Sequence, residues 1–202
     1  MSEVINDTET PTSTKMEDSW KAGDILLVVV AFAVIIALAI GGFLYYLSTK
    51  PPTVIEGMTA PEFTFPVYGG GEASLSSYRG KVVLVNVWNT TCVECKKEMP
   101  LMENEYQSSR GKPFEILAVS TDRDGAAIIE PFVNKLVNEN GAPVMLTFPI
   151  LMDTKNEVGS TYQTVRYPES FIINKDGTVA KIVIGRLMPE DFLYIDYLVN
   201  SP

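Results

Sequence analysis

The chain has only two cysteines, Cys92 and Cys95, and two residues separate them. They closely follow a mainly apolar run, residues 82–87, so the pair lies where a strand is expected to give way to a helix. Two thiols placed in this way can close a small disulfide ring and reopen it. The residues therefore predict thiol–disulfide exchange.

The two thiols are expected to have different roles. Cys92 falls at the N-terminus of the predicted helix, where free N–H groups and the helix dipole stabilise a thiolate. We therefore expect Cys92 to be the exposed nucleophile, with the lower pKa of the two. Cys95 lies one turn later and should point inward, from where it resolves a mixed disulfide by attacking Cys92.

Several other chemistries are excluded by composition. The chain has no histidine, which rules out imidazole catalysis and histidine-ligated zinc, copper or haem within one subunit. Lys96 stands where a c-type haem attachment motif has histidine. Two cysteines supply only half of a tetrahedral zinc site, so we expect no metal and no cofactor. The net charge of −9 argues against nucleic acid or acidic lipid as a partner.

Residues 25–49 contain no charged side chain. A helix of this length spans roughly 35 Å, enough for a hydrocarbon core about 30 Å thick. The apolar region of a signal peptide is shorter, and a core helix would carry a polar stripe. We therefore predict a single-pass membrane anchor, with the lipid bilayer contacting Ile25 to Leu47.

The orientation of this anchor follows from charge and from redox chemistry. Lys15 and Lys21 precede the span and only Lys50 follows it closely, which favours a cytoplasmic N-terminus. Disulfide exchange between proteins is commonest outside the cytoplasm. The prediction is a protein of the cell (inner) membrane whose catalytic domain is periplasmic or extracellular.

The remaining chain divides into a tail, a linker and one domain. Residues 1–24 carry six acidic residues against two lysines and little apolar content, which predicts a disordered acidic tail. Residues 50–56 begin Lys-Pro-Pro and are expected to be a linker. Residues 57–202 have the size of one ordinary domain.

Within that domain, strand and helix patterns alternate first, and a hairpin with a helix follows. This order predicts an α/β fold with a mixed sheet. The expected elements are a hairpin of 63–67 and 73–75, strands 82–88 and 114–120, a helix from 92 kinked by Pro100, a helix around 126–138, a hairpin of 171–173 and 179–184, and a helix over 189–199.

Four segments carry a resemblance to a known family. They read Ala-Pro-Glu-Phe at 60–63, Leu-Ser-Ser-Tyr-Arg-Gly-Lys at 75–81, the cysteine motif through Glu-Met-Pro at 98–100, and Tyr-Pro-Glu-Ser-Phe-Ile-Ile-Asn-Lys-Asp-Gly at 167–177. From about Gly57 the chain resembles the membrane-anchored TlpA/ResA/DsbE type of thiol–disulfide oxidoreductases, within the AhpC/TSA-like thioredoxin superfamily. The resemblance implies a thioredoxin fold with an N-terminal β-hairpin extension and a central insertion.

The resemblance also implies roles for individual residues. Pro168 would follow a cis peptide bond beside the disulfide, and the backbone of Tyr167 would pair with an extended substrate, with Trp88 in the same groove. Glu98 would tune the thiols or relay protons, although without the family it reads as a solvated acid beside Lys97. The implied partners are protein thiol or disulfide substrates, such as apocytochrome c, and a membrane-embedded electron donor.

The chain departs from the family pattern at two positions. Thr91 stands where the family usually has tryptophan, which removes an apolar wall and can widen the substrate groove. Glu94 stands where proline is frequent, and its negative charge should raise the cysteine pKa values and make the disulfide less oxidising. These residues predict a reductant.

Two alternatives remain open. A thiol peroxidase of the peroxiredoxin type would have proline seven residues and threonine three residues before its reactive cysteine, where this chain has Val85 and Asn89. A non-catalytic binding module would carry a static structural disulfide. A static disulfide should be buried, whereas a catalytic one leaves Cys92 open to attack.

Overall fold

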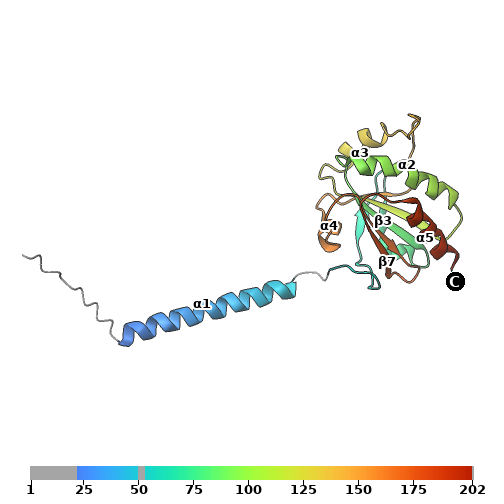
Figure 1. Ribbon diagram of the computed structural model, residues 1–202. Coiled ribbons are helices and arrows are strands. Elements are labelled where there is room, and N and C mark those ends of the chain that lie inside the picture. The colour runs from blue at the N-terminus through green and yellow to red at the C-terminus, as the bar shows by residue number, and fades with distance from the viewer. Residues whose placement is uncertain (1–21, 50–52, 202) are drawn as a thin grey trace, which may run out of the picture. The chain divides into compact units, whose positions relative to one another are not determined.

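The computed structural model describes residues 22–49 and 53–201, and these belong to two separate compact units (Figure 1). The first contains helix α1, Ala22–Thr49, in which Gly23–Tyr46 is long and apolar enough to cross a membrane. All side chains described from Gly23 to Tyr46 are exposed. A helix that is apolar on every side needs apolar surroundings, so this segment is a candidate membrane anchor.

The helix begins earlier than the predicted boundary at residue 25. Asp24, expected in the tail, lies in the first turn of α1, where an acidic side chain is favourable next to the positive end of the helix dipole. The rest of the predicted acidic tail, residues 1–21, lies outside the described residues.

A five-stranded sheet forms the centre of the second unit, in the order β5-β4-β3-β6-β7. Strands β3 and β4 are parallel and are buried along their whole length, as their nearly continuous apolar sequences require. The strands are β3 Val82–Trp88, β4 Phe114–Ser120, β5 Ile150–Met152, β6 Glu169–Ile173 and β7 Val179–Ile184. Because β6 runs antiparallel to both of its neighbours, β3 and β7, the predicted α/β fold with a mixed sheet is confirmed.

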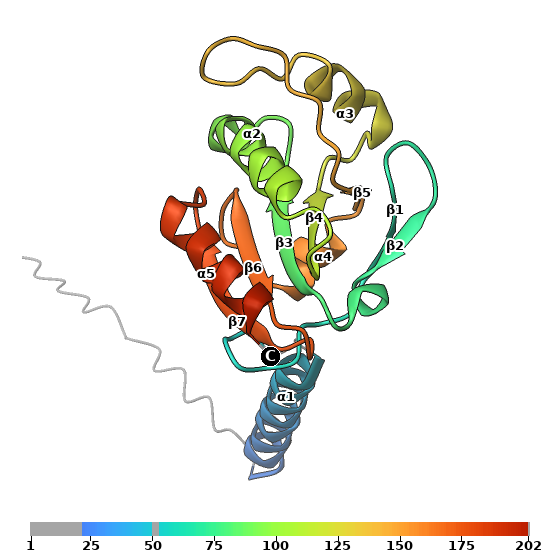
Figure 2. The same cartoon turned by 90° about the vertical axis from the view of Figure 1, so that its right-hand side faces the viewer.

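Each face of the sheet has its own apolar layer, because successive residues of β3 point to opposite sides. Val82, Leu84 and Trp88 pack with helices α2 and α5, while Val83, Val85 and Val87 pack with the N-terminal hairpin and α4. The covering elements, labelled in Figure 2, are α2 Val93–Ser108, α3 Ala126–Val133, α5 Pro189–Asn200, α4 Glu157–Thr161 and the hairpin of β1 Thr64–Pro66 and β2 Glu72–Ser74. A 3-10 turn, Leu75–Tyr78, follows the hairpin.

The segment between α3 and β5, residues 134–149, is the central insertion. The predicted helix around 126–138 ends early, at Val133, two residues after Pro131. The buried carboxylate of Glu103 on α2 anchors the insertion. It accepts hydrogen bonds from the backbone N–H of Thr147 at 2.7 Å and from the hydroxyl of Thr147 at 2.8 Å. The insertion is therefore fastened to the helix that carries the cysteines.

Two residues of the predicted linker, residues 50–56, contact the second unit. The first three residues of the linker lie outside the described part of the chain, but Val54 is buried and Glu56 accepts a hydrogen bond from the backbone N–H of Ile182. Packing of the second unit thus begins before Gly57, because an apolar side chain at position 54 can join its core.

Candidate active site

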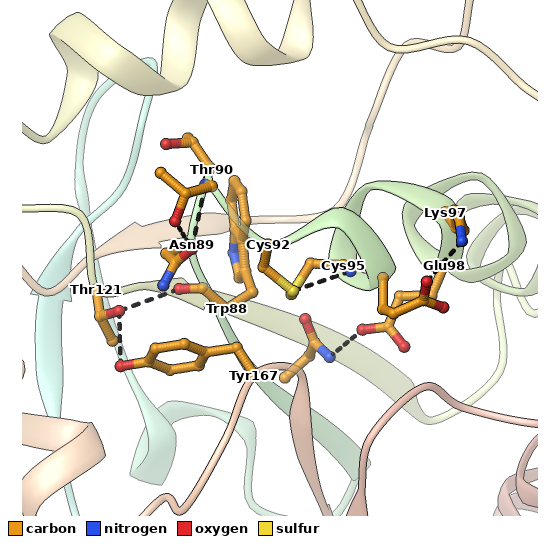
Figure 3. Close-up of a disulfide and its surroundings, with 12 residues drawn as sticks. Trp88, Asn89, Thr90, Cys92, Cys95, Lys97, Glu98, Thr121 and Tyr167 are labelled. Atoms are coloured by element: carbon orange, nitrogen blue, oxygen red, sulfur yellow. Dashed lines mark hydrogen bonds and ion pairs between the residues drawn. A yellow bond between two sulfur atoms is a disulfide. The ribbon is translucent and has the colours of Figure 1, made fainter.

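Cys92 and Cys95 form a disulfide at the end of the sheet where β3 leads into α2 (Figure 3). Cys92 is the residue that caps the N-terminus of α2, and its Sγ accepts a hydrogen bond from the backbone N–H of Cys95 at 3.1 Å. Cys92 is half-buried, whereas Cys95 is fully buried. The structure therefore makes Cys92 the accessible sulfur and Cys95 the inner one.

Glu98 is fully buried, so the alternative of a solvated surface acid is wrong. Its carboxylate accepts hydrogen bonds from Asn86 Nδ2 at 2.8 Å and from the backbone N–H of Leu187 at 3.0 Å. Burial raises the pKa of Glu98 to about 7, against the opposing effects of these two hydrogen bonds and of Arg186. Residues three apart on a helix share a face, so a group able to exchange a proton near neutral pH lies next to Cys95.

Asn86 is a functional candidate that the sequence analysis missed. It lies on the face of β3 that packs against α2, and its Nδ2 donates both to Glu98 and to the Ser170 hydroxyl of β6, at 2.9 Å. Its Oδ1 has no hydrogen-bond partner among the described residues. The signal available in the sequence was the single polar residue in an otherwise apolar buried strand.

The structure corrects the expected placement of Trp88 in an open substrate groove. The Trp88 side chain is fully buried, and its ring packs against Phe132 at a centroid distance of 5.0 Å. The reason is its position in β3, where it points toward the α2 face of the sheet together with Val82 and Leu84. Trp88 thus belongs to the core next to Cys95 and offers no surface to a substrate.

Tyr167 and Pro168 lie in the loop before β6, with Tyr167 half-buried and Pro168 buried. The peptide bond between them is cis. The Tyr167 hydroxyl is hydrogen-bonded to the Thr121 hydroxyl at 3.0 Å (Figure 3). Their role in binding a substrate strand stays a prediction.

Thr121 and Asp122, directly after β4, form hydrogen bonds both to the turn before Cys92 and to the loop of Tyr167. The sequence analysis did not identify these two residues. The Asp122 carboxylate accepts from the Thr90 backbone N–H and from the Thr90 hydroxyl, both at 2.9 Å. The adjacent Thr121 donates its backbone N–H to the Trp88 carbonyl at 2.9 Å and contacts Tyr167. Thr121 and Asp122 therefore fix the turn that precedes Cys92 relative to the Tyr167 loop.

Glu94 is exposed and forms an ion pair with Lys97 at 2.5 Å. The hydrogen bond from Lys97 holds the pKa of Glu94 below its usual value, with Lys97 and Arg186 adding electrostatic attraction. The carboxylate is ionised, as the sequence argument assumed, but a neighbouring cation offsets its charge. Its expected effect on the thiols is therefore smaller than its position between them implies.

Comparisons with known proteins agree with this geometry. Residues 57–182 match the model of the AhpC/TSA family. The thiol-disulfide oxidoreductase ResA of Geobacillus thermodenitrificans is 35% identical over 167 residues, which cover 82% of this chain and 91% of that protein. ResA of Bacillus subtilis is 34% identical over 146 residues, covering 72% of this chain and 75% of the relative.

Similarity to a solved structure extends the comparison to the fold. The crystal structure of StoA from Bacillus subtilis superposes with a TM-score of 0.55 at 25% identity and covers 67% of this chain and 96% of its own. An accessible cysteine at a helix N-terminus, a buried partner cysteine and relatives of the same named activity lead to one conclusion. The chain belongs to the AhpC/TSA family and is a thiol–disulfide oxidoreductase with a thioredoxin-like fold.

Proposed function

We propose that this enzyme is a membrane-tethered reductant of disulfides in proteins outside the cytoplasm, with apocytochrome c as a candidate client. The observation that carries the proposal is the unequal exposure of the two sulfurs, half-buried at Cys92 and fully buried at Cys95. Only the outer sulfur is open to a protein substrate, and this asymmetry suits sequential exchange through a mixed disulfide.

In the proposed reaction the reduced enzyme begins with a thiolate at Cys92. This thiolate attacks one sulfur of the substrate disulfide, so that a Cys92–substrate bond forms and the other substrate sulfur leaves and takes up a proton. Cys95 then loses its proton, attacks the Cys92 sulfur and releases the second substrate thiol. Glu98, with its pKa near 7, is placed to accept the proton that Cys95 loses.

The reducing direction is supported by the buried acid beside the thiols. A carboxylate close to Cys95 opposes a second negative charge, so it disfavours the stabilised thiolate that makes a disulfide strongly oxidising. Glu98 fits this role better than Glu94, because Glu98 is buried and Glu94 is exposed and paired with Lys97.

The proposed location is the cell (inner) membrane, with α1 as a single-pass anchor. The N-terminus would be cytoplasmic, since Lys15 and Lys21 precede the span, and the C-terminal domain would be periplasmic or extracellular. The oxidised enzyme would regain its electrons from a membrane-embedded donor, because thiol reductants of the cytoplasm do not reach that side.

The test is the reduction potential of the full-length protein in detergent, titrated against thiol buffers while alkylation counts free Cys92 and Cys95. A value near that of thioredoxin, about −270 mV, would support a reductant. A value near that of DsbA, about −120 mV, would contradict the reducing direction. A disulfide that never equilibrates with the buffer would support the static binding module instead.

A further inference from the structure

A groove enclosing about 490 Å³ begins at Val93, the residue after the accessible cysteine, and runs between α2 and the central insertion. Both α2 and the insertion contribute apolar side chains to the groove. Basic side chains and one acidic side chain also line it. Trp88, Tyr167 and Pro168 do not contribute to it, so it is separate from the predicted substrate site at the cis proline. The residues used below are Val93, Lys96, Lys97, Leu101, Val137 and Arg186.

The wall supplied by the insertion is preformed. The Oδ1 atom of Asn138 accepts hydrogen bonds from the backbone N–H groups of Asn140 and Ala142, at 3.0 and 2.9 Å. Val137 pairs with Pro143 through an isolated β-bridge, and Thr147 anchors the end of the insertion to Glu103. A ligand entering this groove therefore meets a wall that is already ordered, which lowers the entropy cost of binding.

The charge of the groove is opposite to that of the domain around it. Residues 51–202 contain 13 basic and 19 acidic residues, yet Lys96, Lys97 and Arg186 line the groove against a single acid, Glu139. Lys97 is paired with Glu94, whereas Lys96 and Arg186 are exposed and make no ion pair with any described residue. Lys96 is thus open to a ligand beside the disulfide, and so is Arg186, whose attraction to Glu94 and Glu98 acts without an ion-pair contact.

We propose that this groove binds an extended segment of the partner protein that carries acidic and apolar side chains next to its reactive cysteine. The proposal rests on the proposed function, because the segment is delivered by a protein that exchanges disulfides with Cys92. Val93, Leu101 and Val137 would contact its apolar side chains, and Lys96 and Arg186 would contact its carboxylates. Complementary charge of this kind raises the rate of encounter and selects among partners.

The position of the groove explains why such contacts would matter for exchange. A partner cysteine bonded to Cys92 must sit at the N-terminus of α2, and Val93 and Lys96 lie within the next turn of that helix. The residues beside the partner cysteine therefore reach the groove without any rearrangement of the enzyme. Small thiols have no flanking residues and gain nothing from the groove.

The test uses the reduced full-length protein in detergent and two synthetic peptides. Each peptide contains one internal disulfide, flanked by Glu-Leu-Glu in the first and by Lys-Leu-Lys in the second. The rate of reduction of each peptide is measured at low and high salt. Each rate is divided by the rate at which the same protein, in its oxidised form, reacts with dithiothreitol, so that changes in the thiols themselves cancel.

Wild type is expected to reduce the acidic peptide about tenfold faster than the basic one at low salt, and salt should reduce that ratio toward one. The double variant Lys96→Glu/Arg186→Glu should abolish or invert the ratio. The matched control Arg110→Glu/Lys155→Glu makes the same change in net charge outside the groove and should keep most of the preference.

Equal rates for the two peptides in wild type would overturn the groove proposal, and so would an equal loss of preference in the groove and control variants. Failure of wild type to react with dithiothreitol is a separate outcome, because it would contradict thiol exchange itself and with it the proposed function.

Discussion

Replacing Glu98 by glutamine should remove a pH-dependent loss of folding stability that results from burying an ionisable acid. The Glu98 side chain is fully buried, and burial raises its pKa from an ordinary value of 4.5 to about 7. One pKa unit corresponds to about 1.36 kcal/mol, so this rise is equivalent to about 3 kcal/mol of folding free energy. Glutamine has the same shape and cannot ionise.

The sign follows from proton binding. Between pH 4.5 and about 7 the folded protein keeps a proton on Glu98 that the unfolded chain has lost. The stability contributed by the protonated acid is complete below pH 4.5 and is lost as the pH rises through about 7. The difference in unfolding free energy, Glu98→Gln minus wild type, should therefore increase by about 3 kcal/mol from about pH 4 to about pH 8.

The assay is urea unfolding of the oxidised C-terminal unit, residues 51–202, across this pH range. Glu72→Gln serves as a control, because it removes an exposed carboxyl group from the surface hairpin. Taking differences between variants cancels the titration of every other group. A difference for Glu98→Gln that stays constant with pH, as expected for the control, would refute the argument that burial holds this acid protonated.

Two further predictions concern residues around the disulfide. Asp122→Ala removes hydrogen bonds from Thr90 and Ser120, so it should lower the unfolding free energy by about 2 kcal/mol. Urea unfolding checks this value. An equal loss of unfolding free energy in Asp124→Ala, at an exposed neighbouring residue, would contradict it. Glu94→Gln should change the reduction potential by less than about 30 mV, because Lys97 already offsets the charge of Glu94. Titration against thiol buffers measures this change. A larger change would make Glu94 the main determinant of the reduction potential.

The central strands were predictable because burial leaves a simple pattern. β3 and β4 are buried on both faces, so their apolar runs begin and end with the strands at Val82–Trp88 and Phe114–Ser120. β5 and α4 were missed because they contain only three and five residues. Segments of that length show too few repeats for a period to be recognised.

The cysteine pair could be assigned from sequence, but the residues that support it could not. Cys92 and Cys95 lie close in the chain, and their different exposures follow from the position of a helix N-terminus. By contrast, Asn86 is hydrogen-bonded to Glu98, which is 12 residues away in the sequence. Thr90 is hydrogen-bonded to Asp122, which is 32 residues away, so only the folded sheet brings each pair together. Trp88 was misplaced because it was assigned to the substrate groove, whereas it is the last residue of β3, which is buried on both faces along its whole length.

The most direct test of sequential exchange is to trap the mixed disulfide. Reduced full-length Cys95→Ser and Cys92→Ser proteins are each mixed with a disulfide peptide, and mass spectrometry after digestion identifies the linked sulfur. Because Cys92 is half-buried and Cys95 fully buried, Cys95→Ser should accumulate a peptide bonded to Cys92, while Cys92→Ser should accumulate almost none. Preferential trapping on Cys95, or no adduct with either variant, would contradict the assignment of Cys92 as the nucleophile.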